Sequence, residues 1–186
     1  MKRLFDLILS VIVLIVFFVP MLLIAFSIVL TSKGPALYFS ERVGCQNTIF
    51  KMPKFRSMRI NTPVRATHLI SSVNEYLSPI GGFLRRYSLD ELPQIFSILK
   101  GDMSFVGPRP ALFNQDDLIE LRTSKGLAHL MPGLTGWAQV NGRDELSIPE
   151  KVKLEVEYLD RKSFWFDLKI LWMTILKVIS RHGISH

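Results

Sequence analysis

The chain has 186 residues, enough for one catalytic-size domain with a short appendage. Hydrophobic residues make up 48% of it, which excludes intrinsic disorder as its main state. The 23 Lys and Arg residues outnumber the 16 Asp and Glu residues, and the net charge of +7 favours a membrane surface or an anionic substrate. The single cysteine, Cys45, excludes a disulfide framework and a cysteine-cluster metal site.

Residues 7–32 contain no charged side chain and are mostly Leu, Ile, Val and Phe. At about 1.5 Å per residue, a helix of this length crosses a hydrocarbon core of about 30 Å. Pro20 lies near the middle and would divide the helix into two halves, each too short to cross alone. Basic residues flank both ends, so they give no orientation. The residues alone leave open a kinked spanning helix and a re-entrant helix that enters one leaflet and returns.

The following segment predicts short strands over 36–44 and 48–58, separated by a tight turn. Two further strands are predicted at 103–106 and 135–140. Because the strands and helices do not alternate regularly, the predicted fold class is α/β, a compact mixed domain with short strands rather than a doubly wound sheet.

Helices are predicted between these strands and after them. One begins near Ser88 and ends at Gly101, and another begins at Ser147 and ends at Arg161. The C-terminal segment 163–183 combines aromatic, aliphatic and basic residues, which is typical of an amphipathic helix at a membrane interface. An ordinary packing helix is the alternative for this segment.

The strongest candidate for chemistry is the acidic pair Asp90-Glu91, which follows Arg85-Arg86. A helix N-terminus favours a phosphate, two carboxylates can bind a divalent cation, and an aspartate can form an aspartyl-phosphate. The alternative is structural, because Ser88 and Glu91 have the spacing of a capping box, in which Glu91 serves only as a cap. Pro93 favours Asp90 over Ser88 as the N-cap, since it then lies in the first helical turn.

Basic residues beside rigid turns form a second group of candidates. Lys54 lies in the segment KFRSMR, Arg109 lies between Pro108 and Pro110, and Arg143 follows an Asn-Gly turn. Several such cations together fit recognition of a diphosphate. The sequence contains no nucleic-acid-binding pattern, so nucleic acid is not an expected partner.

Five segments carry a resemblance to a known family: KFRSM (54–58), FLRRYSLDELPQ (83–94), GDMSFVGPRP (101–110), PGLTGWAQVNGR (132–143) and FDLKIL (166–171). In these segments and in their order the chain resembles the small monotopic phosphoglycosyl transferases, the bacterial sugar transferase family. The family moves a sugar 1-phosphate from a UDP-sugar to polyprenyl (undecaprenyl) phosphate and releases UMP. The chain is similar to its minimal members.

The resemblance also implies residue roles. Asp90 matches the nucleophile that forms a covalent phosphosugar intermediate, Glu91 matches its partner, and both would hold Mg²⁺. Substrate-binding roles fall on Arg85, Lys54, Pro108, Arg109, Pro110 and Asp167, and the phosphate-recognition candidate Arg143 joins them. The family's membrane segment is a re-entrant helix broken at a proline, which Pro20 matches.

The resulting prediction is a Mg²⁺-dependent transferase with a re-entrant anchor over 1–32 and a catalytic domain over 33–186 that carries a C-terminal interfacial helix. The expected location is the cytoplasmic face of the bacterial inner membrane, with UDP-sugar, polyprenyl phosphate and anionic membrane lipid as partners. A membrane-anchored basic scaffold and a nucleotide-sugar hydrolase are the alternatives. The sequence leaves open the sugar, the glycan pathway and the oligomeric state, including a homodimer.

Overall fold

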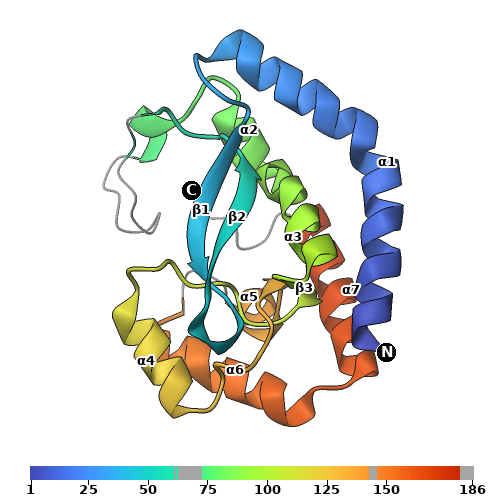
Figure 1. Cartoon of the computed structure of the whole chain (residues 1–186), viewed down its shortest axis with the longest axis vertical. Coiled ribbons are helices and arrows are strands. Elements are labelled where there is room, and N and C mark those ends of the chain that lie inside the picture. The colour runs from blue at the N-terminus through green and yellow to red at the C-terminus, as the bar shows by residue number, and fades with distance from the viewer. Residues whose placement is uncertain (61, 63–72, 143–145, 181–186) are drawn as a thin grey trace.

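The computed structural model describes residues 1–60, 62, 73–142 and 146–180. Helices and short strands form a mixed assembly with a long apolar helix at the N-terminus (Figure 1), as the sequence predicted. In chain order the elements are α1 (Lys2–Thr31), β1 (Leu37–Val43), the 3₁₀ helix η1 (Cys45–Asn47), β2 (Ile49–Phe55), the 3₁₀ helix η3 (Val73–Tyr76), α2 (Gly81–Arg86), the 3₁₀ helix η4 (Leu89–Gln94), α3 (Ile95–Lys100), β3 (Ser104–Val106), α4 (Asp116–Ser124), β4 (Gly133–Thr135), α5 (Trp137–Asn141), α6 (Ile148–Arg161) and α7 (Phe164–Ser180).

Helix α1 has 30 residues and contains Pro20, which cannot donate a backbone hydrogen bond. The helix is continuous through this residue, and it changes direction partway along its length (Figure 1). A proline inside a helix is a sufficient cause of such a bend. In the part of the chain that the structure describes, α1 is the one helix long and apolar enough to cross a membrane.

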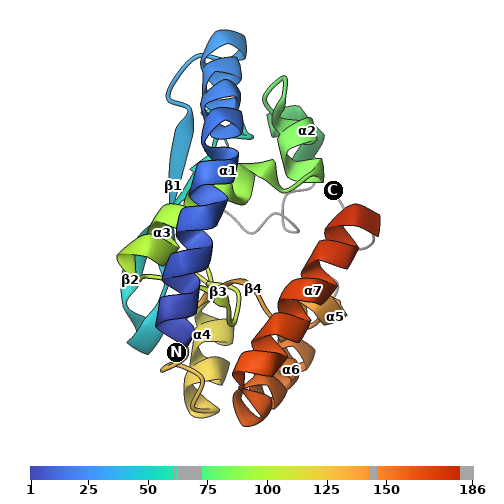
Figure 2. The same cartoon turned by 90° about the vertical axis from the view of Figure 1, so that its right-hand side faces the viewer.

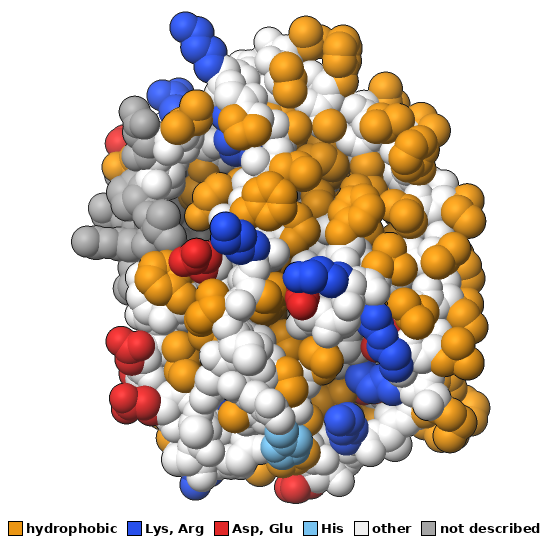
Figure 3. All heavy atoms as spheres, in the orientation of Figure 1, with side chains coloured by type: hydrophobic (Ala, Val, Ile, Leu, Met, Phe, Trp, Pro, Cys, Tyr) orange, Lys and Arg blue, Asp and Glu red, His pale blue; other side chains and the backbone are white. Residues whose placement is uncertain are grey.

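One side of α1 packs on the rest of the chain, and the other side is exposed. Leu9, Val13 and Leu14 contact the main hydrophobic core, and Ile28 is fully buried in a second cluster. The outward side is apolar, and it forms the hydrophobic edge on the right of Figure 3. Its exposed large apolar residues are Leu4, Ile8, Val11, Ile12, Ile15, Val16, Phe18, Val19, Leu22, Leu23, Phe26, Val29 and Leu30.

Helices α1 and α7 lie on the same side of the molecule (Figure 2). Their N-terminal ends touch, since the rings of Phe5 and Phe164 meet edge to face with centroids 5.3 Å apart. Helix α7 also exposes large apolar side chains, among them Trp165 and Trp172. This side of the molecule therefore presents apolar surface from both ends of the chain.

The predicted hairpin is confirmed. Strands β1 and β2 pair antiparallel from Leu37 opposite Phe55 to Val43 opposite Ile49. The turn between them is made by η1, in which Gln46 and Asn47 have φ values of 54° and 57°. Asn is among the residues that tolerate this left-handed conformation best.

A second, parallel pair joins β3 to β4, with Ser104 opposite Gly133 and Val106 opposite Thr135. The strand predicted at 103–106 is confirmed, but the strand predicted at 135–140 is wrong over most of its length. The chain leaves β4 at Thr135 and forms helix α5 from Trp137 to Asn141. In so short a run the apolar residues fit both the helical and the strand period, so the pattern could not separate them.

The helix predicted after Ser88 also differs. Ser88 has a φ of 53° and makes no side-chain capping bond, and a 3₁₀ segment, η4, precedes the α-helix α3. The predicted end is confirmed, because Gly101 adopts a left-handed conformation after α3. Helix α6 is confirmed as well, with a complete capping box between Ser147 and Glu150.

Candidate active site

The acidic pair lies on η4, immediately after the left-handed Ser88. Asp90 is buried and Glu91 is partly buried. The capping-box interpretation of Glu91 is wrong, since Ser88 makes no side-chain capping bond at this helix. The carboxylate of Glu91 instead faces two cations from distant parts of the chain.

Glu91 accepts hydrogen bonds from Lys54 and Arg109 at the same oxygen. Its Oε1 lies 2.9 Å from Lys54 Nζ and 2.9 Å from Arg109 Nη2. Lys54 comes from β2, and Arg109 comes from the segment after β3. The structure therefore brings together four residues singled out from the sequence: Asp90, Glu91, Lys54 and Arg109.

The segment 108–110 is held through its backbone carbonyls. Gly133 N donates to the Pro108 oxygen at 2.8 Å, Arg122 Nη2 donates to the Arg109 oxygen at 3.0 Å, and Arg42 Nη1 donates to the Pro110 oxygen at 3.2 Å. The two prolines are buried and have no N–H. They therefore restrict the backbone conformation and offer carbonyl acceptors, but they donate no hydrogen bond.

Glycine is required just before this segment. A Cβ atom on Gly107 would lie 2.2 Å from the Met131 carbonyl oxygen, closer than any real contact of this kind. The backbone of β3 therefore packs closely against the chain leading into β4, and this contact fixes the position of the backbone just before Arg109.

Burial raises the pKa of the Asp90 carboxyl above its ordinary value. Lys54, Arg85 and Arg109 act in the opposite direction, and Glu91 reinforces the rise. Burial also lowers the pKa of the Lys54 ammonium, while the charge of Glu91 opposes that change. Arg85, in the last turn of α2, thus acts on Asp90 through its charge, and the phosphate-binding role that the resemblance implies for it stays a prediction.

Arg42 is a further cation of this site that sequence reasoning missed. Burial and the neighbouring Arg109 lower its pKa to about 10, and Glu91 acts in the opposite direction. In the sequence Arg42 is only one of the basic residues after the apolar helix. Its place in the site follows from the bridge between Arg42 and Leu112, which joins distant segments and leaves no local signal in the sequence.

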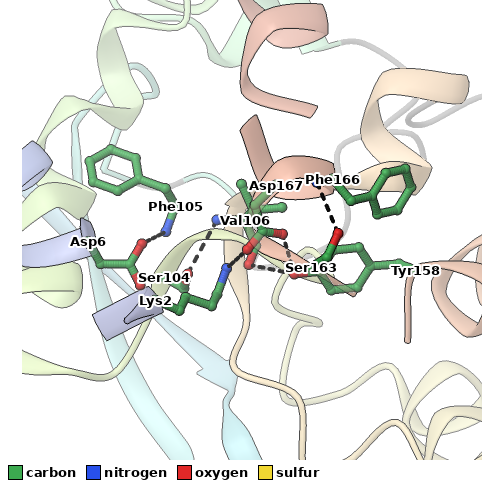
Figure 4. A network of polar contacts seen from close by, with 9 residues as sticks. All are labelled: Lys2, Asp6, Ser104, Phe105, Val106, Tyr158, Ser163, Phe166 and Asp167. Atoms are coloured by element: carbon green, nitrogen blue, oxygen red, sulfur yellow. Dashed lines mark hydrogen bonds and ion pairs between the residues drawn. The ribbon is translucent and has the colours of Figure 1, made fainter. Parts of the chain in front are cut away.

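Asp167 lies in a different polar network (Figure 4). Its Oδ2 is 2.5 Å from Lys2 Nζ, and its Oδ1 accepts a hydrogen bond from the Tyr158 hydroxyl at 2.8 Å. Nearby, Asp6 of α1 accepts from the backbone N–H of Phe105 at 3.3 Å. The structure therefore connects Asp167 to the base of α1 and not to the acidic pair. Arg143 lies outside the described residues.

The acidic side chains of the site determine which metal ion it could hold. In the described ranges no group of three or more His, Cys, Asp or Glu side chains converges. Mg²⁺ is commonly held by one or two carboxylates together with phosphates of the substrate. Among the described residues, the side-chain hydrogen bonds of the site go to Glu91 Oε1, and none goes to the Asp90 carboxylate. The pair Asp90-Glu91 fits this donor set, and it would hold a Mg²⁺ ion together with phosphate and water ligands.

Known proteins resemble this chain over most of its length. The model of the bacterial sugar transferase family matches residues 1–181. The chain is 39% identical over 188 residues to the uncharacterized sugar transferase EpsL of Bacillus subtilis, covering 100% of this chain and 90% of that protein. Over 184 residues it is 37% identical to the UDP-glucose:undecaprenyl-phosphate glucose-1-phosphate transferase of Escherichia coli, covering 95% of this chain. Over 200 residues it is 34% identical to the undecaprenyl-phosphate galactose phosphotransferase of Salmonella typhimurium, covering 98% of this chain.

The chain belongs to the bacterial sugar transferase family, as its sequence motifs predicted. It spans 40% of the length of the Escherichia coli relative and 41% of the Salmonella relative.

Proposed function

We propose that this protein is a phosphoglycosyl transferase. It moves a sugar 1-phosphate from a UDP-sugar to undecaprenyl phosphate and thereby begins the membrane steps of a glycan assembly pathway. The observation that carries the proposal is the buried Asp90 beside Glu91, whose carboxylate is held by Lys54 and Arg109. The printed activities of the Escherichia coli and Salmonella relatives support the same class of donor and acceptor.

The proposed reaction has two displacements at phosphorus. An Asp90 carboxylate oxygen attacks the β-phosphorus of the UDP-sugar, and the bond from that phosphorus to the bridging oxygen breaks, so UMP leaves with the electron pair. A phosphate oxygen of undecaprenyl phosphate then attacks the same phosphorus. The aspartyl bond breaks, the Asp90 carboxylate is regenerated and the diphosphate-linked sugar leaves. Splitting the transfer in this way is the usual benefit of covalent catalysis.

The surrounding side chains support this chemistry by their charge. Lys54, Arg85 and Arg109 favour the ionised form of Asp90, which burial alone would disfavour. The same cations, together with Arg42, offset the negative charge of a bound diphosphate. Glu91 orients Lys54 and Arg109 by bonding to both.

We further propose that Asp90 and Glu91 hold Mg²⁺ when the donor binds. The ion would neutralise the diphosphate and stabilise the departing UMP. Chelation with EDTA should then abolish UMP release, and Mg²⁺ should restore it. Full activity in EDTA would remove the metal from the mechanism.

The proposed location is the cytoplasmic face of the bacterial inner membrane. Helix α1 is inserted as a re-entrant helix, and α7 lies at the interface. The exposed apolar side of α1 and the exposed Trp165 and Trp172 of α7 support this arrangement. A single cysteine placed at position 2, in a variant lacking Cys45, tests the topology: labelling from outside the cell would contradict the re-entrant form.

The central test is UMP release by the full chain in membranes, with a panel of UDP-sugars and with or without undecaprenyl phosphate. A transferase should give sustained release only with the acceptor. Continuous release without it would indicate a nucleotide-sugar hydrolase. Lipid binding without UMP release for any donor would indicate a scaffold. The Asp90→Asn variant provides the background of the assay.

A further inference from the structure

A buried ion pair joins α4 to α6 and also reaches the segment 108–110. Arg122 of α4 faces Glu155 of α6 with two parallel contacts, Nε to Oε2 at 2.8 Å and Nη2 to Oε1 at 2.5 Å. Glu155 is only 2% exposed. The same Nη2 atom donates a third hydrogen bond, to the backbone oxygen of Arg109 at 3.0 Å.

Stability alone does not account for this arrangement. Burying an ion pair costs about as much desolvation as it gains in attraction, and well-packed apolar residues of similar volume often serve as well or better. Apolar residues, however, could not donate to the Arg109 oxygen. The feature that only Arg122 supplies is a planar fork whose donors reach a carboxylate and a backbone carbonyl at once.

The third contact acts on a backbone that has few other donors. Pro108 and Pro110 carry no N–H, so the position of this segment depends on what its carbonyl oxygens accept. Arg109 is the residue whose guanidinium lies 2.9 Å from Glu91 Oε1. A shift of the Arg109 backbone therefore moves a cation that faces the acidic pair.

We propose that Arg122, oriented by Glu155, is a positioning residue that sets where the Arg109 guanidinium lies beside Glu91. The proposal rests on the proposed function of the acidic pair. Glu155 holds the Arg122 guanidinium in place, and Arg122 in turn holds the Arg109 backbone carbonyl. The Arg109 guanidinium then binds the phosphate that is transferred. Misplacing a catalytic group by about 1 Å can lower a rate by about 100-fold, so this linkage is expected to appear in the turnover number.

The test separates position from stability with two variants of the full chain. In the double variant Arg122→Met/Glu155→Leu, the unfolding midpoint should equal or exceed that of the wild type, because an apolar pair replaces a buried ion pair. Its kcat for UMP release should fall by about 10-fold to 100-fold, with a smaller change in the KM for UDP-sugar. Glu155→Gln should instead lower the unfolding midpoint more than it lowers kcat. It leaves Arg122 buried without a counter-charge, which lowers the midpoint, but it keeps the contact to Arg109, so its loss of kcat is smaller than that of the double variant.

Lys100→Ala provides the control, because it removes an ion pair to Asp102 in which the lysine side chain is 75% exposed. Both its unfolding midpoint and its kcat should match those of the wild type.

A stable double variant with wild-type kcat would overturn the proposal, as would a kcat that follows the unfolding midpoint across the series of variants. If the double variant does not fold, Arg122→Lys takes its place, and wild-type kcat in that variant would have the same meaning. Failure of the wild type to release UMP would instead overturn the proposed function.

Discussion

Two buried aspartates of this molecule have opposite surroundings. Asp90 is 8% exposed and Asp167 is 5% exposed, and each has a lysine nearby. Both oxygens of Asp167 are bonded, one to Lys2 and the other to Tyr158 (Figure 4). The Asp90 carboxylate accepts no hydrogen bond from any described residue, although cations surround it. The bonds to both of its oxygens suit Asp167 to hold helices together, whereas Asp90, buried among cations, is suited to react with a phosphate.

The largest expected difference is in turnover. Asp90→Asn should lower UMP release by about 1000-fold or more, because an amide cannot form the acyl phosphate. Its unfolding midpoint at pH 7 should equal or exceed that of the wild type. A group whose folded-state pKa is raised adds stability that is complete below its unfolded-state pKa and is lost as the pH rises through the folded-state value. Above the unfolded-state pKa the wild type therefore loses stability that the Asn variant, which does not titrate, retains. Near-normal turnover would refute the nucleophile assignment.

Glu91→Gln should lower kcat by about 100-fold, since an amide holds Lys54 and Arg109 less strongly than a carboxylate. The two cations then lose the charge that fixes them beside Asp90. Steady-state UMP release and differential scanning fluorimetry would be measured together. A loss of activity that is matched by unfolding at the assay temperature would indicate a structural role for Glu91 instead.

The pH dependence sharpens the comparison. Asp90 must be ionised to attack, and burial raises its pKa. As the pH is lowered, activity should therefore be lost at a pH above the ordinary aspartate pKa of about 3.9. Lys54 opposes the rise, so in Lys54→Met the acid limb should move to still higher pH. Pre-steady-state UMP release at several pH values measures this limb. A limb that stays in place or moves to lower pH in Lys54→Met would contradict the account.

The smallest expected effect on turnover is at Asp167. Asp167→Asn leaves Lys2 and the Tyr158 hydroxyl without their charged acceptor, so the free energy of unfolding should fall by about 1–3 kcal/mol. The folded fraction should retain its KM for UDP-sugar, which can be measured below the unfolding transition. A normal midpoint with a raised KM would restore the substrate-binding role that the family resemblance assigned to Asp167.

Features with local signals could be predicted from the sequence. The hairpin followed from two strand-like runs around a turn, α6 followed from its capping box and proline, and Gly101 marked the end of α3. The acidic pair, Lys54 and Arg109 were also found, because they lie in segments that resemble a family with specific motifs.

The remaining features depend on contacts between distant segments. Helix α5 and the 3₁₀ start at Ser88 are short, and at such lengths tertiary contacts outweigh local propensity. Arg42 and Arg122 resemble ordinary basic residues until the fold places them on the carbonyls of 108–110. The position of Asp167 likewise follows from its pairing with Lys2, 165 residues away in the chain.

The most direct test of the central claim is intact-mass spectrometry of the protein after mixing with a UDP-sugar in the absence of acceptor. The account predicts UMP release of at most one equivalent and a mass increase equal to one sugar phosphate, located on Asp90 by peptide mapping. The adduct should disappear when undecaprenyl phosphate is added. A donor that supports turnover but leaves no adduct, or an adduct on another residue, would contradict Asp90 as the nucleophile.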